Sequence, residues 1–224
     1  MNILDALYHS INHKDYVFDI DTIRIEYSLR YKLQQLQDLG KWTKLKKDGF
    51  KYNQISKRLD EKEIASVYKL EDYNIYYYRK RDKQNRTKAV MVIFGMKQYH
   101  KAPPPRELIN SIVTILTHKI DFMKYRDFEI DLCFDTPVVP NYDLLAKEYK
   151  LKTVLSSRGV THYINNPRLL MIRSVCIYDK ASKNTLDAPL FRYEATIHIP
   201  NPKALSLPLD DFIEIIQKGM TYEN

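Results

Sequence analysis

Three segments of this sequence alternate between apolar and polar residues, which is the pattern of a β-strand with one face on a core. In each segment the polar face carries acids, bases, thiols or a phenol. These residues are Glu129, Asp131, Cys133 and Asp135 in 128–136, Cys176, Tyr178 and Lys180 in 175–180, and Arg192, Glu194, Thr196 and His198 in 191–199. The alternation predicts that chemically active side chains from three strands lie on a single face of one sheet.

The rest of the chain mixes strand and helix patterns. β-rich runs occupy 16–31, 64–70, 73–80, 88–95 and 160–165, and helical spacing is found at 31–40, 105–120, 141–150 and 209–219. Hairpins interleaved with a few helices are typical of an α+β fold. We therefore expect a largely antiparallel sheet with helices on one face and a polar functional face on the other. A single domain over 1–224 is expected, with two pseudo-repeated halves, 16–137 and 138–224, as a variant.

Charge and cysteine usage narrow the choice of partners and compartment. The formal net charge of +8 favours an anionic partner, with nucleic acid ahead of an anionic membrane surface. The two cysteines, Cys133 and Cys176, lie in strand-like runs without a CxxC pair, which indicates a reduced, cytoplasmic setting. No run approaches the roughly 20 apolar residues of a membrane span, and the first residues do not form a signal peptide, so no membrane partner is expected.

The polar strand faces suit phosphoryl transfer. The carboxylates of Asp131, Asp135 and Glu194 are ligands of the kind that Mg²⁺ or Mn²⁺ prefers, and such an ion polarises a phosphodiester. A tyrosine hydroxyl can attack the phosphorus, while Lys180 or Arg192 neutralises the charge that develops. The alternative is an ordinary two-sided sheet with cross-strand ion pairs, such as Lys180 with Glu194.

Four motifs, taken in order, resemble those of the tyrosine-dependent initiators (Rep proteins) of rolling-circle plasmids and filamentous phages. They are IDTIRIEYSLRY (20–31), FEIDLCFDT (128–136), CIYDKASKN (176–184) and LFRYEATI (190–197). The resemblance implies nicking of one strand at a replication origin, through a 5′-phosphotyrosine bond and with a divalent metal.

The same resemblance implies roles for individual residues. The metal-binding acids are Asp131, Asp135 and Glu194. Tyr178, Lys180 and Arg192 match catalytic motif residues. The attacking tyrosine is Tyr178 or Tyr163, with Tyr142 as a more remote candidate.

Two basic segments interleaved with aromatic residues are candidate DNA contacts, because cations neutralise phosphates and aromatic rings stack on unpaired bases. The first, 41–58, contains Lys44, Lys46 and Lys47. The second, 73–88, is a tyrosine-rich hairpin whose basic residues are Arg79, Lys80, Arg81, Lys83, Arg86 and Lys88. A solvated loop and a basic surface helix are the alternatives for these segments.

The expected partner is origin DNA, single-stranded or as a hairpin, with a separate polymerase. No glycine precedes a Lys-Ser or Lys-Thr pair, so a Walker A loop is missing and a separate helicase is needed. A homodimer is an open expectation. Two other functions compete: a non-catalytic DNA-binding protein of the same fold that regulates replication, and a basic structural or RNA-binding protein.

Overall fold

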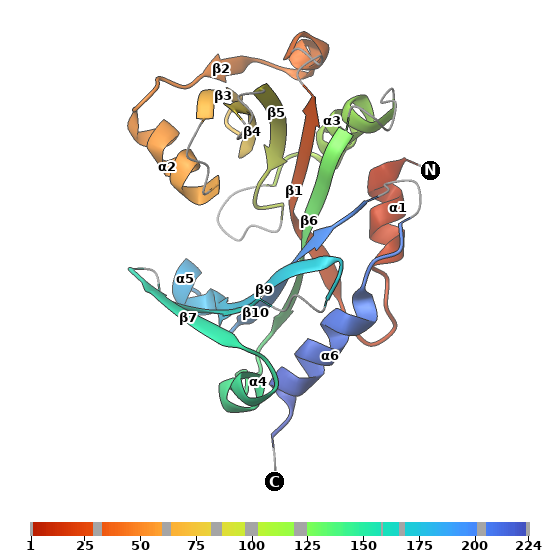
Figure 1. Ribbon diagram of the computed structural model, residues 1–224, viewed down its shortest axis with the longest axis vertical. Coiled ribbons are helices and arrows are strands. Elements are labelled where there is room, and N and C mark those ends of the chain that lie inside the picture. Colours follow the sequence, from red (N-terminus) through yellow and green to blue (C-terminus); the bar gives the residue numbers. More distant parts are fainter. Residues whose placement is uncertain are drawn as a thin grey trace. The chain divides into compact units, whose positions relative to one another are not determined.

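The computed structural model describes residues 2–28, 33–59, 64–81, 87–96, 103–118, 125–157, 159–165, 169–200 and 205–222. The chain forms two compact units (Figure 1). Unit 1 comprises Met1–Leu4, Thr22–Met96 and Ala102–Phe128, and unit 2 comprises Asp5–Asp21, Lys97–Lys101 and Glu129–Asn224. Two long strands, β1 (Phe18–Ser28) and β6 (Tyr125–Thr136), contribute residues to both units.

Unit 1 contains an antiparallel meander at the position that the sequence predicts. Its further strands are β2 (Trp42–Lys44), β3 (Ile64–Leu70), β4 (Ile75–Arg81) and β5 (Thr87–Ile93), and with β1 they follow the order β2-β3-β4-β5-β1. The helical elements are the 3-10 helix η1 (Leu33–Leu39), α2 (Phe50–Leu59) and α3 (Arg106–His118).

The consecutive tyrosines of β4 alternate between the two faces of this meander. Tyr76 and Tyr78 belong to an apolar cluster with Val90 and Val92 of β5, and Tyr52 of α2 covers it. The Tyr52 hydroxyl donates a hydrogen bond to the carbonyl of Ile64 (2.6 Å). The tyrosine run is therefore largely core, as strand alternation requires.

Unit 2 contains the strands that carry the polar motifs. Besides β6, they are β7 (Leu151–Ser156), β8 (Gly159–Ile164), β9 (Ile172–Asp179) and β10 (Phe191–His198). Their order is β6-β10-β9-β8-β7, and all of the described pairings in this set are antiparallel. The helices are α1 (Ile3–Ser10, which begins in unit 1), α4 (Tyr142–Glu148), α5 (Lys180–Asn184) and α6 (Leu209–Met220).

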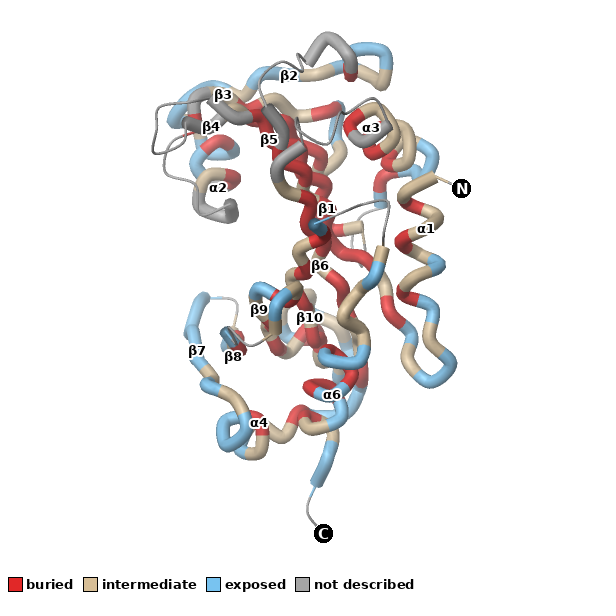
Figure 2. The backbone as a smooth tube through the Cα atoms, turned by 45° about the vertical axis from the view of Figure 1, so that its right-hand side comes forward, coloured by how far each residue is buried: buried red, intermediate tan, exposed pale blue. Residues whose placement is uncertain are grey.

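Helix α6 packs on the apolar face of the unit 2 strands. The ring of Phe212 lies 5.8 Å from that of Phe18, and Phe18 in turn contacts Phe134. Gly219 lets the helix approach β10 closely, because a Cβ at this position would overlap the Tyr193 ring. Figure 2 shows buried residues on β9, β10 and α6, whereas β7 is mostly exposed.

The α+β class is confirmed: the described residues form six α-helices and ten strands, every described pairing being antiparallel. The sequence-based prediction did not include α1, β7 or α5, and two of its own elements differ in detail. The helix expected at 31–40 is a 3-10 turn over Leu33–Leu39, and the strand expected to include Lys180 ends at Asp179. Asp179 ends the strand because its carboxylate accepts a hydrogen bond from the Ser182 amide (2.8 Å) and caps α5. The expected pseudo-repeat stays a prediction.

None of the helices in the described part of the chain is long and apolar enough to cross a membrane.

Candidate active site

The strand register of unit 2 aligns the predicted polar residues in rows. On β10, Arg192 lies opposite Asp135 of β6 and Tyr178 of β9, and Glu194 lies opposite Cys133 and Cys176. Directly opposite residues of an antiparallel pair share a face. The single polar face that alternation predicts is therefore present, and it extends to β8, where Thr161 pairs with Tyr178 and Tyr163 with Cys176.

Arg192 lies at the centre of this face and is fully buried. Its Nε and Nη2 donate to the two oxygens of Asp135 (2.6 and 2.7 Å), and Nη1 donates to Asp21 (2.9 Å). Glu194 is the third acid, with its Oε2 3.8 Å from Nη1. We call Asp21, Asp135, Arg192, Glu194, Tyr178 and Lys180 the Arg192 cluster.

Asp21 of β1 is a member that sequence reasoning missed. It is buried and contacts Arg192 across 171 positions of the sequence. The sequence pattern predicts a strand around Asp21 but not its neighbours. The three carboxylates of the cluster come from β1, β6 and β10, and only the order of strands in the fold brings β1 to the other two. Three hydrogen bonds to Asp135 and Asp21 offset the cost of burying the Arg192 guanidinium.

Tyr178 is buried beside the guanidinium, and its hydroxyl donates to Glu194 Oε2 (3.1 Å). Burial first, and then the charge of Glu194, raise the pKa of this phenol far above its ordinary value. Burial and the charge of Asp21 also raise the pKa of Glu194, against the opposing charge of Arg192. The pair is thus a neutral phenol hydrogen-bonded to a carboxyl group whose affinity for a proton is increased.

Lys180 is the first residue of α5 and is buried. Burial lowers its pKa, as does the charge of Arg192, while Asp21, Asp135 and Glu194 act in the opposite direction. The ammonium nitrogen lies 6.0 Å from the centre of the Tyr178 ring. Lys180 therefore lies within the electrostatic influence of Asp135 and Glu194, as predicted, although it belongs to a helix and not to a strand.

The other tyrosine candidates lie differently. Tyr163 is half-buried on β8, on the same face as Cys176, and burial raises its pKa. Tyr142 begins α4, where its ring lies 4.0 Å from that of His162, and burial raises its pKa to about 12. Of these three tyrosines, Tyr178 is the one for which the structure describes a hydrogen bond from the hydroxyl to one of the predicted metal-binding acids, Glu194.

Each of the three acids of the expected metal site has a hydrogen-bond partner within the protein. Asp135 uses both carboxylate oxygens on Arg192, and Asp131 accepts a hydrogen bond from the Thr196 hydroxyl (2.8 Å). Within the described ranges, no three His, Cys, Asp or Glu side chains are grouped so that they could hold a metal ion. In this arrangement Asp131, Asp135 and Glu194 do not fit a divalent ion.

The predicted DNA contacts are only partly described. Lys44 of β2, and Lys46 and Lys47 after it, are exposed on unit 1. Arg79 of β4 is half-buried, and no described residue accepts a hydrogen bond from its buried Nε. Lys83 and Arg86 lie outside the described residues; for Lys80, Arg81 and Lys88 only the backbone is described, and its register places Lys80 opposite Lys88.

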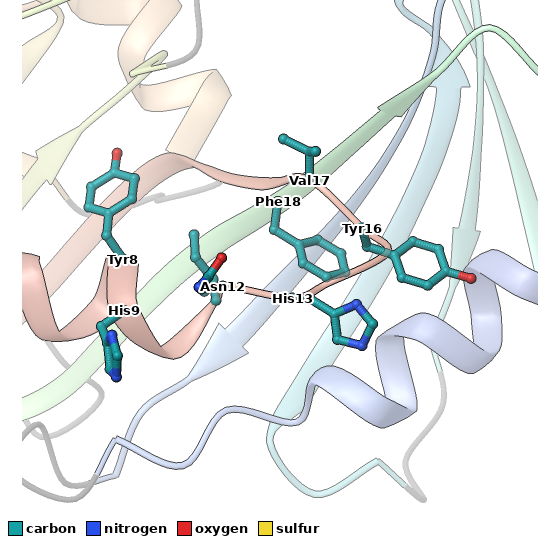
Figure 3. Close-up of a pocket in the computed structure, with 8 residues that line it drawn as sticks. Tyr8, His9, Asn12, His13, Tyr16, Val17 and Phe18 are labelled. Atoms are coloured by element: carbon teal, nitrogen blue, oxygen red, sulfur yellow. The ribbon is translucent and has the colours of Figure 1, made fainter.

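A separate pocket of about 280 Å³ lies at the junction of α1 and β1 in unit 2 (Figure 3). None of the predicted site residues lines it. Its walls are mostly aromatic and imidazole rings, with His13 and Tyr16 5.3 Å apart between ring centres. The lining residues are Tyr8, His9, Ile11, Asn12, His13, Tyr16, Val17 and Phe18.

Comparisons with known proteins give little beyond this geometry. No model of a protein family matches the chain, and no curated protein is similar to it in sequence. Among solved structures, the chain is similar to the rolling circle replication initiator protein from Geobacillus stearothermophilus. The TM-score is 0.44 and the identity 12%, over 90% of this chain and 78% of that one. A likeness at this level does not indicate a function.

Proposed function

We propose that this chain is a DNA nicking and strand-transfer enzyme that initiates rolling-circle replication, with Tyr178 as its nucleophile. The observation that carries the proposal is the 3.1 Å hydrogen bond from the Tyr178 hydroxyl to Glu194, beside a buried guanidinium and a buried lysine. The four motifs that resemble those of Rep proteins supply the substrate class, a phosphodiester of DNA at an origin.

The reaction follows from the protonation states of the pair. The neutral phenol attacks the phosphorus, its proton passes to Glu194, and a bond forms between Tyr178 Oη and phosphorus. The bond from phosphorus to the 3′ oxygen breaks, and that oxygen takes up a proton to give a 3′-hydroxyl. The raised pKa of Glu194 makes its carboxylate a better proton acceptor than an ordinary one.

Lys180 and Arg192 receive different roles in this proposal. Lys180 has its ammonium group near the phenol and neutralises charge on the phosphate as the bond forms. Arg192 has two donors on Asp135 and one on Asp21, so we assign it to holding the carboxylates in place. Tyr163 remains the alternative nucleophile on the same face.

A requirement for Mg²⁺ or Mn²⁺ stays part of the proposal, although the side chains of Asp131, Asp135 and Glu194, as they lie, do not fit the ion. For DNA contact, the exposed Lys44, Lys46 and Lys47 are the strongest described candidates. Polymerase and helicase are proposed as separate partners, and a homodimer remains an expectation.

A strand-cleavage assay tests the function. Negatively supercoiled DNA that carries the sequence around this chain's gene is incubated with the protein and Mn²⁺, with EDTA in a parallel reaction. We expect conversion to the open circular form, lost in Tyr178→Phe and retained in Tyr149→Phe, a matched change near Lys218 and away from the Arg192 cluster. Conversion that persists in Tyr178→Phe would contradict the assignment.

One specific observation favours a second function, a DNA-binding protein without catalysis. Asp135 and Asp131 are already engaged by Arg192 and Thr196, so the acids of the motif can serve the fold alone. Under that alternative the DNA binds and remains supercoiled, with or without Mn²⁺. Binding that is equal in wild type and Tyr178→Phe, without any open circles, would select it.

A further inference from the structure

A second lysine, Lys183, lies closer to Tyr178 than the motif lysine does. Its ammonium nitrogen lies 3.5 Å from the centre of the Tyr178 ring, compared with 6.0 Å for Lys180. The same nitrogen donates a hydrogen bond to the hydroxyl of Thr161 (3.0 Å). The two distances from the Lys183 nitrogen, to the Tyr178 ring and to the Thr161 hydroxyl, are within the range of direct interaction.

The local sequence explains how Lys183 reaches this position. Asp179 caps α5 through the amide and hydroxyl of Ser182 (2.8 and 2.5 Å), which starts a helical turn directly after β9. Residues three apart in a helix lie on the same side, so the turn places Lys180 and Lys183 together. Thr161, which receives the ammonium group, is the cross-strand partner of Tyr178 on β8.

Both the hydroxyl group and the aromatic ring of Tyr178 therefore have a fixed contact. The hydroxyl is fixed by Glu194 and the ring by Lys183, which is itself fixed by Thr161. A lysine on a tyrosine ring often contributes only to stability. Here, however, Lys183 is half-buried and its ammonium group lies next to a phenol that donates to a carboxylate, so it favours the negative form of that phenol.

We propose that Lys183 is a positioning residue for the nucleophile. It orients the Tyr178 ring and stabilises negative charge on the phenol oxygen as the proton leaves for Glu194. This inference rests on the proposed function, and it adds a residue that lies outside the tyrosine-lysine pair of the motif.

A spectroscopic titration of Tyr178 tests the inference without any DNA. A polyfluorinated tyrosine, whose phenol ionises at lower pH, replaces Tyr178, and ¹⁹F NMR follows its ionisation against pH. We expect Lys183→Gln to decrease the ionisation constant of the phenol about tenfold, and Lys183→Arg, which keeps a cation on the ring, to restore most of it. Lys218→Gln, which removes the lysine from the Tyr149 ring at 5.2 Å, is the matched control and should change nothing.

A strand-cleavage measurement on the natural protein completes the test. We expect Lys183→Gln to slow nicking of supercoiled DNA at least tenfold without weakening DNA binding, and Lys183→Arg to recover most of the rate. If Tyr178 nicks DNA but Lys183→Gln alters neither ionisation nor rate, the role of Lys183 is wrong and the proposed function stands. If the ionisation shifts but no nicking occurs in any variant, the proposed function is wrong, and the positioning role falls with it.

Discussion

Arg192 is the residue on which the polar face depends most. Its guanidinium is fully buried and has three donors on Asp135 and Asp21, so its removal leaves carboxylates in the interior without a counter-charge. Truncation of one partner of a buried ion pair is much more costly than loss of a surface pair. This asymmetry gives a direct prediction.

We expect Arg192→Met to lower the free energy of unfolding by about 3–5 kcal/mol. Lys14→Met, which removes an exposed lysine 3.8 Å from Asp15, should cost less than about 1 kcal/mol. Urea denaturation followed by circular dichroism measures both. A loss for Arg192→Met as small as that of the control would show that the carboxylates do not depend on the guanidinium.

Glu194 gives a prediction about pH. Because its pKa is raised from 4.5 in the folded state, the folded protein binds this proton more tightly than the unfolded chain does. Its contribution to stability is therefore complete below the unfolded value and is lost as the pH rises through the raised folded value.

Glutamine does not titrate, so Glu194→Gln removes the loss of stability that the ionisation of Glu194 causes at higher pH. We expect the stability of the variant relative to wild type to increase between about pH 5 and about pH 8, as measured by urea denaturation at each pH. Glu107→Gln, an exposed acid in the first turn of α3, serves as the control. A difference between Glu194→Gln and wild type that is the same at both pH values contradicts the raised pKa.

At the scale of elements, the short helix α5 is what delivers both lysines to Tyr178. Its C-cap residue is Thr185, which has left-handed backbone angles (φ 53, ψ 49) that a β-branched residue adopts only with strain. The strain belongs to the end of the helix, and Thr185 is not a member of the Arg192 cluster. A substitution at Thr185 can therefore relieve the strain and leave the residues of the cluster unchanged.

We expect Thr185→Gly to raise the free energy of unfolding by about 1 kcal/mol, because glycine adopts this conformation without a Cβ penalty. Thr221→Gly changes the same residue type at the end of α6, where the backbone is extended (φ −84, ψ 129), and should give no gain. Thermal unfolding compares the two variants. Equal effects at both positions would mean that the conformation of Thr185 is not strained.

The elements also show what the sequence could and could not predict. Strand alternation placed Glu194, Arg192 and Tyr178 on one face correctly, because it depends only on the period of a strand. It could not place Asp21 in the cluster, since that contact depends on the order of strands in the sheet. Lys183 was missed because the strand pattern was continued through Lys180, although the cap Asp179-x-x-Ser182 signals a helical turn.

At the scale of the whole molecule, the net charge of +8 predicts binding to nucleic acid that weakens with salt. Each lysine that contacts a phosphate adds about 0.9 to the slope of log affinity against log salt concentration for duplex DNA. Lys44, Lys46 and Lys47 of unit 1 are exposed and are the candidate phosphate contacts that the structure describes.

We expect the combined change of Lys44, Lys46 and Lys47 to glutamine to reduce that slope by about 2–3, as measured by fluorescence anisotropy with a labelled duplex. The same change at Lys14, Lys147 and Lys218 alters the net charge equally and should have a smaller effect. Equal reductions in the two triple variants would show that binding follows overall charge and not this surface.

The central claim is that Tyr178 forms a covalent bond to DNA, and covalent capture tests it most directly. The protein is incubated with the supercoiled DNA and Mn²⁺, quenched in denaturant and digested with nuclease and protease, and peptides that carry a nucleotide are identified by mass spectrometry. The proposal predicts a nucleotide on the peptide that contains Tyr178, and none in Glu194→Ala. Open circular DNA without any tyrosine adduct, or an adduct on Tyr163 alone, would contradict the claim.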